Sequence, residues 1–510
     1  MVCLVILTIL ERFSFQVCTR STWVIQKVRL HILENIPDFG EHFLELQDQN
    51  KKSDKELFEE LCSAIGRESV FDNIEERDRY SFNGVNGESM PDVVITPHST
   101  EQVSKILSIV NRHNIPICTR GAGAILSGGA LPIESYIVLD LKNMNNIVEL
   151  NARDLTVTVE PGVCIKNLQD EVAKSRLFYT SEPGILDSTT IGGIVSKCTG
   201  GMTGLKYGVT RDYVLALEIV LPDGSVINAG RKTLKSVAGY DLARFFVGSE
   251  ETLGVLTKIT LKLLPMPEKA CTIVTLFKDI DSALKTTDSI LVHDHLSLRS
   301  LEFVDKTCID AVSDFSEMEI PAEAEALLVI DVDGNEKNVA KDISRIDTLC
   351  KENGALKTSI AHTDEDRNIL LDIGKLISPS LSKITSMRLN EELSVPRSKV
   401  GGVLKNVYEL SKAYSLQAAV FGQIGEGHIN LNVICNNGET AEVSARNLVS
   451  QILKDVVSIG GTAKSVLQPH EVEMMKGLKK MFDPKGIMNP GRLFGNSSAH
   501  RKDAKHAKEI

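Results

Sequence analysis

The alternation of apolar and polar positions near the start of the chain predicts a strand–helix–strand unit. Residues 91–97 form an apolar run bounded by prolines, which is typical of a buried strand. His98-Ser-Thr-Glu101 offers a helix start, and apolar residues then recur at helical spacing as far as residue 114. A second apolar run at residues 115–118 completes the unit, which implies parallel pairing and a right-handed crossover.

The pattern continues as mixed α and β structure and breaks at a proline pair. Strands are expected at residues 136–141, 147–150, 155–159, 215–221 and 257–264, and helices at residues 165–174 and 472–481. Pro265-Met-Pro267 marks a domain boundary. The predicted segments are 1–50, a leader or poorly ordered extension; 51–267, a first domain; 268–496, a second domain; and 497–510, a basic tail.

Composition narrows the class of protein. A chain of 510 residues is too long for a single core. Its net charge of −11 argues against a nucleic-acid binder, which would need a basic surface to neutralise phosphates. The ten cysteines include no Cys-x-x-Cys pair, which argues against zinc or iron–sulfur ligation and for a reducing compartment.

The N-terminus allows two explanations. Met1–Leu10 is apolar but too short to span a bilayer, and basic residues follow it rather than precede it. A transit peptide and an extended start both fit. The expected location is the cytoplasm, with a peripheral place at a membrane as an alternative, or the mitochondrion in a eukaryote.

Two glycine-rich stretches, residues 119–130 and 191–208, carry the first chemical signal. Glycines let backbone N–H groups approach a ligand closely and form an anion-binding nest. The first stretch lacks the third glycine of a Gly-x-Gly-x-x-Gly fingerprint and the Gly-Lys-Ser/Thr of a P-loop. On its own, a turn-rich surface loop explains it equally well.

The order of motifs along the chain is more specific. They are Arg120-Gly-Ala-Gly, Ser127-Gly-Gly, Thr158-Val-Glu-Pro-Gly162, Ile191-Gly-Gly193, Lys206-Tyr-Gly208, Gly239-Tyr-Asp-Leu242, Gly248-Ser-Glu250, Ser394-Val-Pro-Arg397, Phe421-Gly-Gln-Ile-Gly-Glu-Gly427 and Asp483-Pro-Lys-Gly-Ile-Met-Asn-Pro-Gly491. This order resembles the vanillyl-alcohol-oxidase-type flavoproteins, and the C-terminal motifs are similar to the glycolate-oxidase FAD subunit and D-lactate dehydrogenase branch. The resemblance covers Glu56 to Phe494. It implies an α+β fold, with a two-subdomain PCMH-type FAD-binding domain followed by an FAD-linked oxidase C-terminal domain.

The resemblance also implies FAD as the cofactor. The residues that would hold its pyrophosphate are Arg120, Gly121, Ala122, Gly123, Ala124, Ser127 and Gly128. Those that would line the flavin are Ile191, Gly192, Gly193, Gly200, Gly201, Tyr207 and Gly208, with Asn489 near the isoalloxazine. Relatives with covalent flavin carry a histidine in the first loop. Ala124 and its neighbours include none, so non-covalent FAD is predicted.

The expected chemistry is hydride transfer from a hydroxyl-bearing carbon to the flavin, while a base takes the hydroxyl proton. In relatives two histidines and a later glutamate hold a divalent metal there. This chain has Gln423 and Asn430 at the histidine positions and lacks the later Glu-His-Gly segment. Neutral amides are poor ligands for divalent cations, so a metal is the less favoured alternative. Glu426 and His428, in the same motif, are the candidates for the base.

Further positions bear on substrate and cofactor. Arg388 and Arg397 are the candidates for binding a substrate carboxylate, because a guanidinium can grip both oxygens. The arginine that relatives use corresponds to Gly374. The resemblance places Ile194 and Cys198 near the flavin, at positions where relatives have asparagine, and Glu251 at a position where they have glycine.

The resulting hypothesis is an FAD-dependent dehydrogenase of a small D-2-hydroxy acid. Its electrons would pass to a quinone, a cytochrome or an electron-transfer protein, since no nicotinamide fingerprint is present. The alternative is a catalytically weak or inactive FAD-binding subunit of an oxidase complex. A flavin-dependent ether-lipid synthase would need consecutive histidines, which the chain lacks.

Overall fold

The computed structural model describes residues 55–84, 87–121, 136–180, 188–292, 296–313, 320–385, 387–435, 439–463 and 466–493. It divides into two units, Met1–Glu68 and Ser69–Ile510. In the first, residues 55–65 form a helix in which Leu57, Leu61 and Ile65 recur every fourth position and are buried. Among the described residues, no helix combines the length and hydropathy that a membrane crossing needs.

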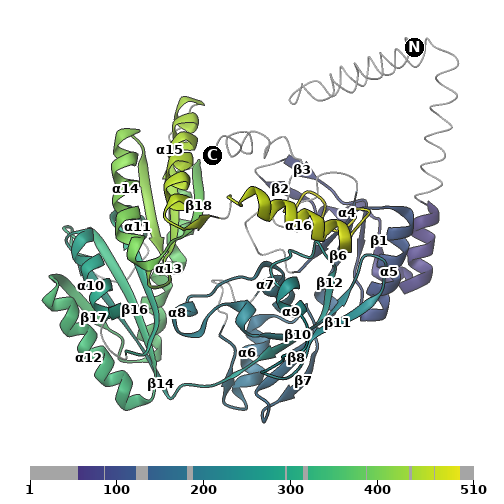
Figure 1. Cartoon of the computed structure of the whole chain (residues 1–510), viewed down its shortest axis with the longest axis horizontal. Coiled ribbons are helices and arrows are strands. Elements are labelled where there is room, and N and C mark those ends of the chain that lie inside the picture. The colour runs from purple at the N-terminus through teal and green to yellow at the C-terminus, as the bar shows by residue number, and fades with distance from the viewer. Residues whose placement is uncertain are drawn as a thin grey trace. The chain divides into compact units, whose positions relative to one another are not determined.

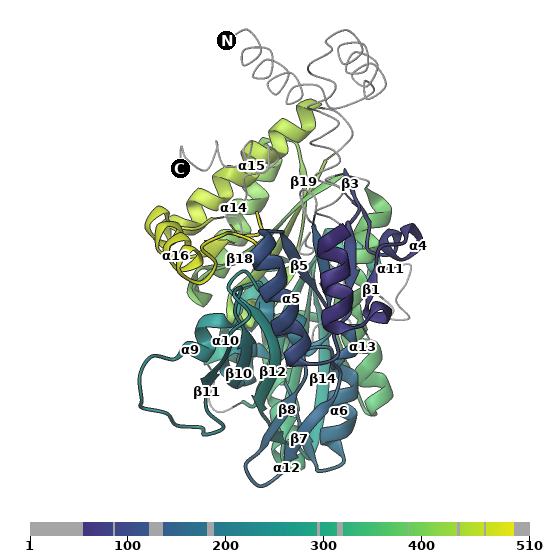
Figure 2. The same cartoon turned by 90° about the vertical axis from the view of Figure 1, so that its right-hand side faces the viewer.

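A four-stranded sheet begins the second unit, in the order β1 (Val70–Phe71), β4 (Val93–Ile95), β6 (Ile137–Asp140) and β5 (Ile117–Arg120). Helix α5 (Thr100–His113) joins β4 to β5, as predicted (Figure 2). It begins at Ser99, whose side chain accepts a hydrogen bond from the N–H of Gln102, and ends at Asn114 in the left-handed conformation. The expected direct pairing of β4 with β5 is wrong, because β6 lies between them and pairs in parallel with both.

A five-stranded antiparallel sheet follows. Its order is β11 (Val226–Gly230), β10 (Val214–Val220), β12 (Val255–Lys262), β8 (Thr156–Val159) and β7 (Ile147–Asn151). These strands confirm the predictions at residues 147–150, 155–159, 215–221 and 257–264. Helices α6 (Ile165–Ala173), α7 (Ile191–Lys197) and α9 (Leu242–Phe246) share its core, whereas α8 (Gly204–Tyr207) connects toward the C-terminal half.

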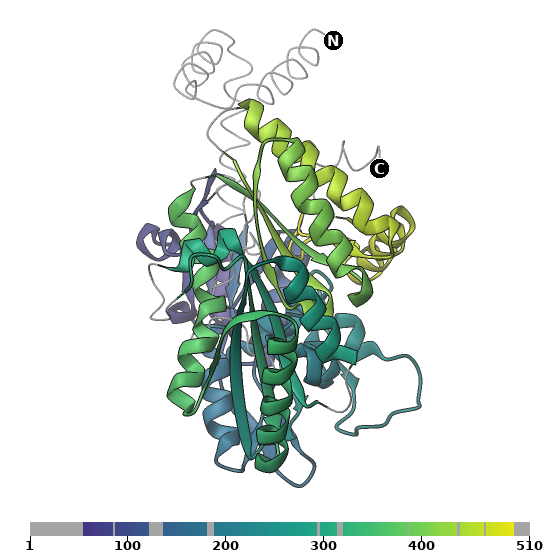
Figure 3. The same ribbon diagram turned by 90° about the vertical axis from the view of Figure 1, so that its left-hand side faces the viewer.

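An eight-stranded sheet forms the C-terminal half (Figure 3). Its order is β17 (Ala355–Ile360), β14 (Lys269–Phe277), β16 (Ala326–Gly334), β15 (Leu298–Asp305), β19 (Gln417–Gly422), β20 (His428–Ile434), β18 (Arg388–Ser394) and β21 (Thr462–Ala463). One face packs against α10 (Ile280–Val292), α12 (Glu336–Glu352), α14 (Val400–Ala413) and α15 (Glu439–Ser458). The other face packs against α11 (Lys306–Ser313) and α13 (Asp364–Ile384).

The end of the chain returns to the N-terminal sheets. Helix α16 (Pro469–Phe482), yellow in Figure 1, places Phe482 against Phe246 with ring centroids 5.4 Å apart. The N–H of Ile117 on β5 donates to Ile487 O (2.8 Å), and its carbonyl accepts from Asn489 N (2.9 Å). The final segment therefore completes the edge of the four-stranded sheet.

Candidate functional site

The two glycine-rich stretches meet at the end of β5. A Cβ atom at Gly121 would lie 2.6 Å from Thr190 Oγ1, so only glycine permits this approach. The guanidinium of Arg120 lies over the ring of Tyr80, 4.8 Å from its centroid. The remaining predicted pyrophosphate residues lie outside the described part of the chain; they are Ala122, Gly123, Ala124, Ser127 and Gly128.

The glycines of the second stretch have different roles. Thr190 caps α7 by accepting a hydrogen bond from Gly193 N (3.3 Å). Gly192 serves packing, since a Cβ atom there would lie 2.7 Å from Pro161 Cβ. Above Gly200, in contrast, the nearest described atom is Val209 Cγ1 at 3.9 Å. Open space beside a glycine backbone fits a bound ring system, so this part of the chain is compatible with FAD.

The other predicted flavin residues differ in their burial and backbone conformation. Ile191 is fully buried in the core of the five-stranded sheet, so its side chain is a packing residue. Gly208 has φ 80°, where a side chain would be strained. Cys198 ends α7 with φ 52°, a conformation that asparagine or glycine would tolerate better. Gly201 follows directly, and its carbonyl accepts from Gly204 N (3.3 Å).

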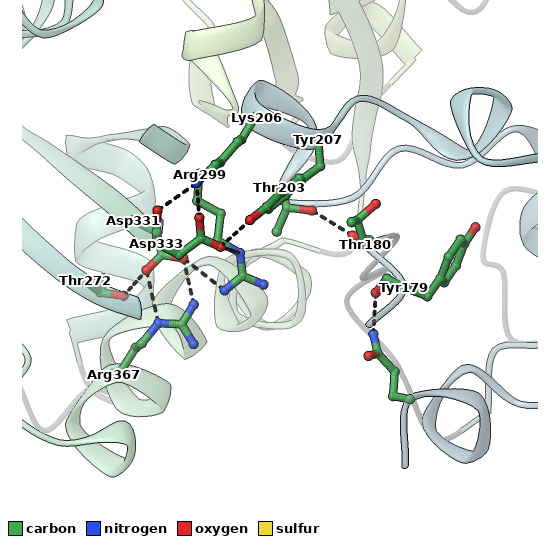
Figure 4. A network of polar contacts seen from close by, with 11 residues as sticks. Tyr179, Thr180, Thr203, Lys206, Tyr207, Thr272, Arg299, Asp331, Asp333 and Arg367 are labelled. Atoms are coloured by element: carbon green, nitrogen blue, oxygen red, sulfur yellow. Dashed lines mark hydrogen bonds and ion pairs between the residues drawn. The ribbon is translucent and has the colours of Figure 1, made fainter. Parts of the chain in front are cut away.

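Helix α8 is fixed to the C-terminal sheet by a cluster of buried charges (Figure 4). Lys206 Nζ lies 2.5 Å from Asp333 Oδ1, and the Tyr207 hydroxyl donates to Asp333 Oδ2 (2.8 Å). Arg299 on β15 pairs with Asp333 and with Asp331, 3.6 and 3.4 Å away. Burial, reinforced by the Asp333 carboxylate, raises the pKa of Tyr207. We call these contacts of Lys206, Tyr207 and Arg299 with Asp333 the α8 clamp. The Tyr207 hydroxyl, which was predicted to line the flavin, is thus bound to Asp333.

Asn489 joins three segments that lie far apart in the sequence. Its Oδ1 accepts from Thr119 N (3.1 Å), and its Nδ2 donates to Thr119 Oγ1 (3.2 Å) and Glu250 O (2.6 Å). The side chain is 9% exposed. Its amide therefore holds the end of β5 in place, at the position where the flavin contact was predicted.

Alternation along the strands puts several candidate residues on one face of the eight-stranded sheet. Leu389 and Leu393 of β18 and Ile429 and Leu431 of β20 point into the core beneath α14 and α15. The intervening residues of these strands point to the opposite, α13-facing side; they include Arg388, Asn390, Glu392, His428, Asn430 and Asn432. Glu302 of β15 lies on the same side, because its neighbours Leu301 and Phe303 enter that core.

Glu302 is a buried acid that the sequence patterns did not single out. Its side chain accepts a hydrogen bond from Gln423 Nε2 (3.2 Å), and Gly374 of α13 packs against it. Burial raises its pKa to about 7, opposed by the Gln423 hydrogen bond. A Cβ atom at Gly374 would lie 2.9 Å from Glu302 Oε2, so a larger side chain at this position would displace the carboxyl. The available signal was an acid between the apolar residues Leu301 and Phe303.

Glu426 lies at the junction of α8 and the 3₁₀ turn Ile424–Glu426. A Cβ atom at Gly204 would be 2.4 Å from its Oε2. Burial raises its pKa to about 7; a hydrogen bond from the Leu205 N–H and the charge of Arg397 oppose the rise, whereas Glu302 adds to it. Its Oε1 has no hydrogen-bond partner within the described ranges. Glu426 and Glu302 thus form an acidic pair with a free acceptor atom.

The structure places the remaining candidates differently. Burial lowers the pKa of His428, opposed by Glu392, so its imidazole is neutral at pH 7. Arg388 donates from Nη2 to Ser378 Oγ (3.0 Å), and its buried Nη1 lacks a partner among the residues described. Arg397 is exposed and influences Glu426 through its charge. The electrostatic partner of Glu426 is therefore Glu302 rather than His428.

The positions of the relatives' metal ligands do not fit a metal here. The Gln423 amide donates to Glu302, and Asn430 offers a second neutral amide. Within the described ranges, no group of three His, Cys, Asp or Glu side chains could hold a metal ion. We therefore assign no catalytic step to a metal.

Two family models match the chain. A FAD binding domain covers residues 91–230, and the FAD linked oxidases, C-terminal domain, covers residues 266–466 and 464–493. The chain belongs to the FAD-linked oxidases and carries their FAD-binding domain. This confirms the predicted fold and cofactor.

Among curated relatives, glycolate oxidase subunit GlcD of Bacillus subtilis is 35% identical over 467 residues, which span 88% of this chain and 98% of that protein. The D-lactate dehydrogenase of Archaeoglobus fulgidus is 32% identical over 417 residues, 79% of this chain and 91% of the relative. Among solved structures, 4-ethylphenol oxidase from Gulosibacter chungangensis has a TM-score of 0.69 at 19% identity and covers 87% of this chain and 97% of its own. That likeness supports the fold alone.

Proposed function

We propose that this chain is an FAD-dependent dehydrogenase that oxidises a small D-2-hydroxy acid, of the lactate or glycolate type, to the 2-oxo acid. The names of its relatives, glycolate oxidase subunit and D-lactate dehydrogenase, support the substrate class. The observation that carries the proposal is Glu426, a half-buried carboxyl next to helix α8, whose Oε1 has no hydrogen-bond partner among the residues described and whose pKa is raised to about 7. Such a group is suited to accept a proton at neutral pH.

Glu302 and Glu426 have different surroundings. Burial raises the pKa of both to about 7, and Arg397 and the Leu205 N–H stabilise the anion of Glu426. Glu302 is 5% exposed, and the hydrogen bond from Gln423 opposes the effect of its burial. We assign Glu426 as the base for the substrate hydroxyl and Glu302 as the neutral acid behind it. Bound FAD supplies the acceptor for the substrate hydride.

For the substrate carboxylate, Arg388 is the better supported of the two predicted arginines. It lies on the same face of the sheet as Glu302, and both groups contact α13, at Ser378 and Gly374 respectively. Four residues along a helix correspond to about 6 Å. Its Nη1 is a buried donor that a carboxylate oxygen would satisfy.

Electrons would leave to a non-nicotinamide acceptor, which we propose is a quinone, a cytochrome or an electron-transfer protein. The relatives named as a glycolate oxidase subunit support a place within an oxidase complex. A peripheral position at a membrane would bring the flavin close to such an acceptor.

A second function is favoured by the hydrogen bond between Gln423 and Glu302. An amide occupies the position of a metal-ligating histidine, and its donor is already engaged. A chain altered in this way could retain FAD without oxidising a substrate, as a subunit that supports a catalytic partner.

Anaerobic reduction of the flavin separates these functions. The purified protein should be yellow and should bleach with D-lactate or glycolate but not with L-lactate. The same experiment on Glu426→Gln, and on the wild type after dialysis against EDTA, tests the base and the absence of a metal. A yellow protein that no 2-hydroxy acid bleaches would favour the second function. A colourless protein that does not take up FAD would reject both.

A further inference from the structure

The loop between β11 and α9 exposes large apolar side chains. Residues 231–241 form neither helix nor strand, and all of them are exposed. The exposed fractions of Leu234, Val237 and Tyr240 are 70%, 87% and 93%. A single exposed apolar residue needs no explanation, but three within one loop form an apolar patch. Figure 2 shows this loop projecting between the β11 and α9 labels.

Core packing does not account for these apolar residues. Gly239 has φ 74°, which lets the chain turn, and a Cβ atom there would meet no described atom within 4 Å. Val237 and Tyr240, on either side of this turn, keep most of their surface in water and so contribute little to folding. Their apolar character therefore points to a surface outside this protein.

The same segment is basic, although the whole chain has a net charge of −11. Residues 231–244 contain four cations and one acid, Asp241. Asp241 pairs with Arg244 (3.4 Å), and Lys232 pairs with Glu149 of β7. The cations of the segment are Arg231, Lys232, Lys235 and Arg244. The loop thus presents positive charge around its apolar side chains.

Helix α16 extends the apolar surface. Phe482 packs against Phe245 and Phe246 of α9, with ring centroids 5.9 and 5.4 Å apart. Met474 and Met481, two turns apart on α16, are 69% and 66% exposed. Figures 2 and 3 show α16 and the loop on the same side of the second unit. Two separate segments therefore contribute exposed apolar residues to that side.

The mixture of apolar and basic residues favours a lipid bilayer as the partner. The core of a protein–protein interface is depleted of charge, whereas Lys235 directly follows Leu234 in this loop. Segments that lie in the bilayer interface combine apolar side chains with Lys and Arg, which attract anionic headgroups. Tyr240 has the amphipathic ring that is enriched at this depth.

We propose that residues 231–242, together with the exposed side of α16, dock onto the surface of an anionic lipid bilayer. Leu234, Val237 and Tyr240 enter the headgroup region, and the cations beside them contact the anionic headgroups. This inference goes beyond the proposed function and does not depend on it, because docking requires neither a substrate nor flavin reduction.

Flotation of the full chain with vesicles tests the proposal. The wild type should float with vesicles of phosphatidylcholine and phosphatidylglycerol in equal parts, more weakly with phosphatidylcholine alone, and less at high salt. The double substitution Val237→Ser with Tyr240→Ser should lower the partition coefficient by about tenfold or more, because it removes buried apolar surface. Lys235→Glu should lower it by about fivefold or more on the anionic vesicles.

The matched control is Val292→Ser at the end of α10, where the valine is 83% exposed, and it should float like the wild type. A wild type that binds neither kind of vesicle would overturn the inference. Equal binding by the wild type and the loop variants would also overturn it, since all of them retain the apolar Met1–Leu10 run as another possible contact. A chain that dimerises through this loop without binding vesicles would assign the patch to a second copy instead.

Discussion

Gly204 lies directly against the carboxyl of Glu426, so that a Cβ atom on the glycine would be 2.4 Å from Oε2. The first residue of α8 thereby fixes the position of the proposed base. This close approach joins the FAD-binding half of the chain to the C-terminal half at the proposed site of chemistry.

Gly204→Ala should displace the Glu426 carboxyl and slow flavin reduction by about 10- to 100-fold, because small misplacements of a catalytic group have large effects on rate. FAD affinity should stay at the wild-type value. The matched control is Gly402→Ala on α14, where a Cβ atom meets nothing within 4 Å. Stopped-flow bleaching of both variants is the measurement, and equal rates would contradict the proposed role of Glu426.

Glu426→Gln should lower the rate of flavin reduction by about 100-fold or more, the usual contribution of a general base. In the wild type the base acts in its ionised form, so the rate should fall as the pH drops below about 7, where the carboxyl becomes protonated. The variant should lose this dependence. A variant with the wild-type pH profile would show that another group takes the proton.

Glu302→Gln should stabilise the fold at pH 8 and have little effect at pH 4.5. The folded state raises the pKa of Glu302 from 4.5 to about 7, so it binds this proton more tightly than the unfolded chain. The corresponding stability is present below pH 4.5 and is lost as the pH rises through 7, by up to about 3 kcal/mol. Urea unfolding at the two pH values measures the difference. An equal effect of the substitution on the free energy of unfolding at both pH values would show that the folded state does not bind the Glu302 proton more tightly.

Asp333→Ala should destabilise the fold by about 3–5 kcal/mol, because it removes the carboxylate partner of Lys206 and leaves Arg299 paired with Asp331 alone. The control is Asp372→Ala, which removes an exposed pair with Lys375 and should cost less than about 1 kcal/mol. Urea denaturation compares the two. Similar small effects would mean that the α8 clamp contributes little to stability.

Local patterns predicted the helices and strands that are specified by nearby residues. The helix at residues 100–113 has its capping residues Ser99 and Asn114 within its own segment, so the sequence shows both ends. The insertion of β6 between β4 and β5 depends on the packing of three separate segments. No periodicity within any one of them specifies that order.

The site was predictable to a similar extent. Glu426 was found because it lies in a recognisable motif, but its partner Glu302 is on a strand more than 100 residues earlier, and only the fold brings them together. The amide of Asn489 was expected near the flavin. Its actual partners, Thr119 and Glu250, depend on the return of the C-terminal segment, which no local pattern indicates.

The return of residues 487–489 to β5 has a consequence for biosynthesis. Asn489 N and Ile487 O supply hydrogen-bond partners to Ile117, so this edge of the N-terminal sheet stays incomplete while the ribosome is still translating the C-terminal half. A nascent chain that ends before these residues cannot close that edge. The four-stranded sheet therefore gains these edge hydrogen bonds only after residues 487–489 have been synthesised and have folded back onto β5.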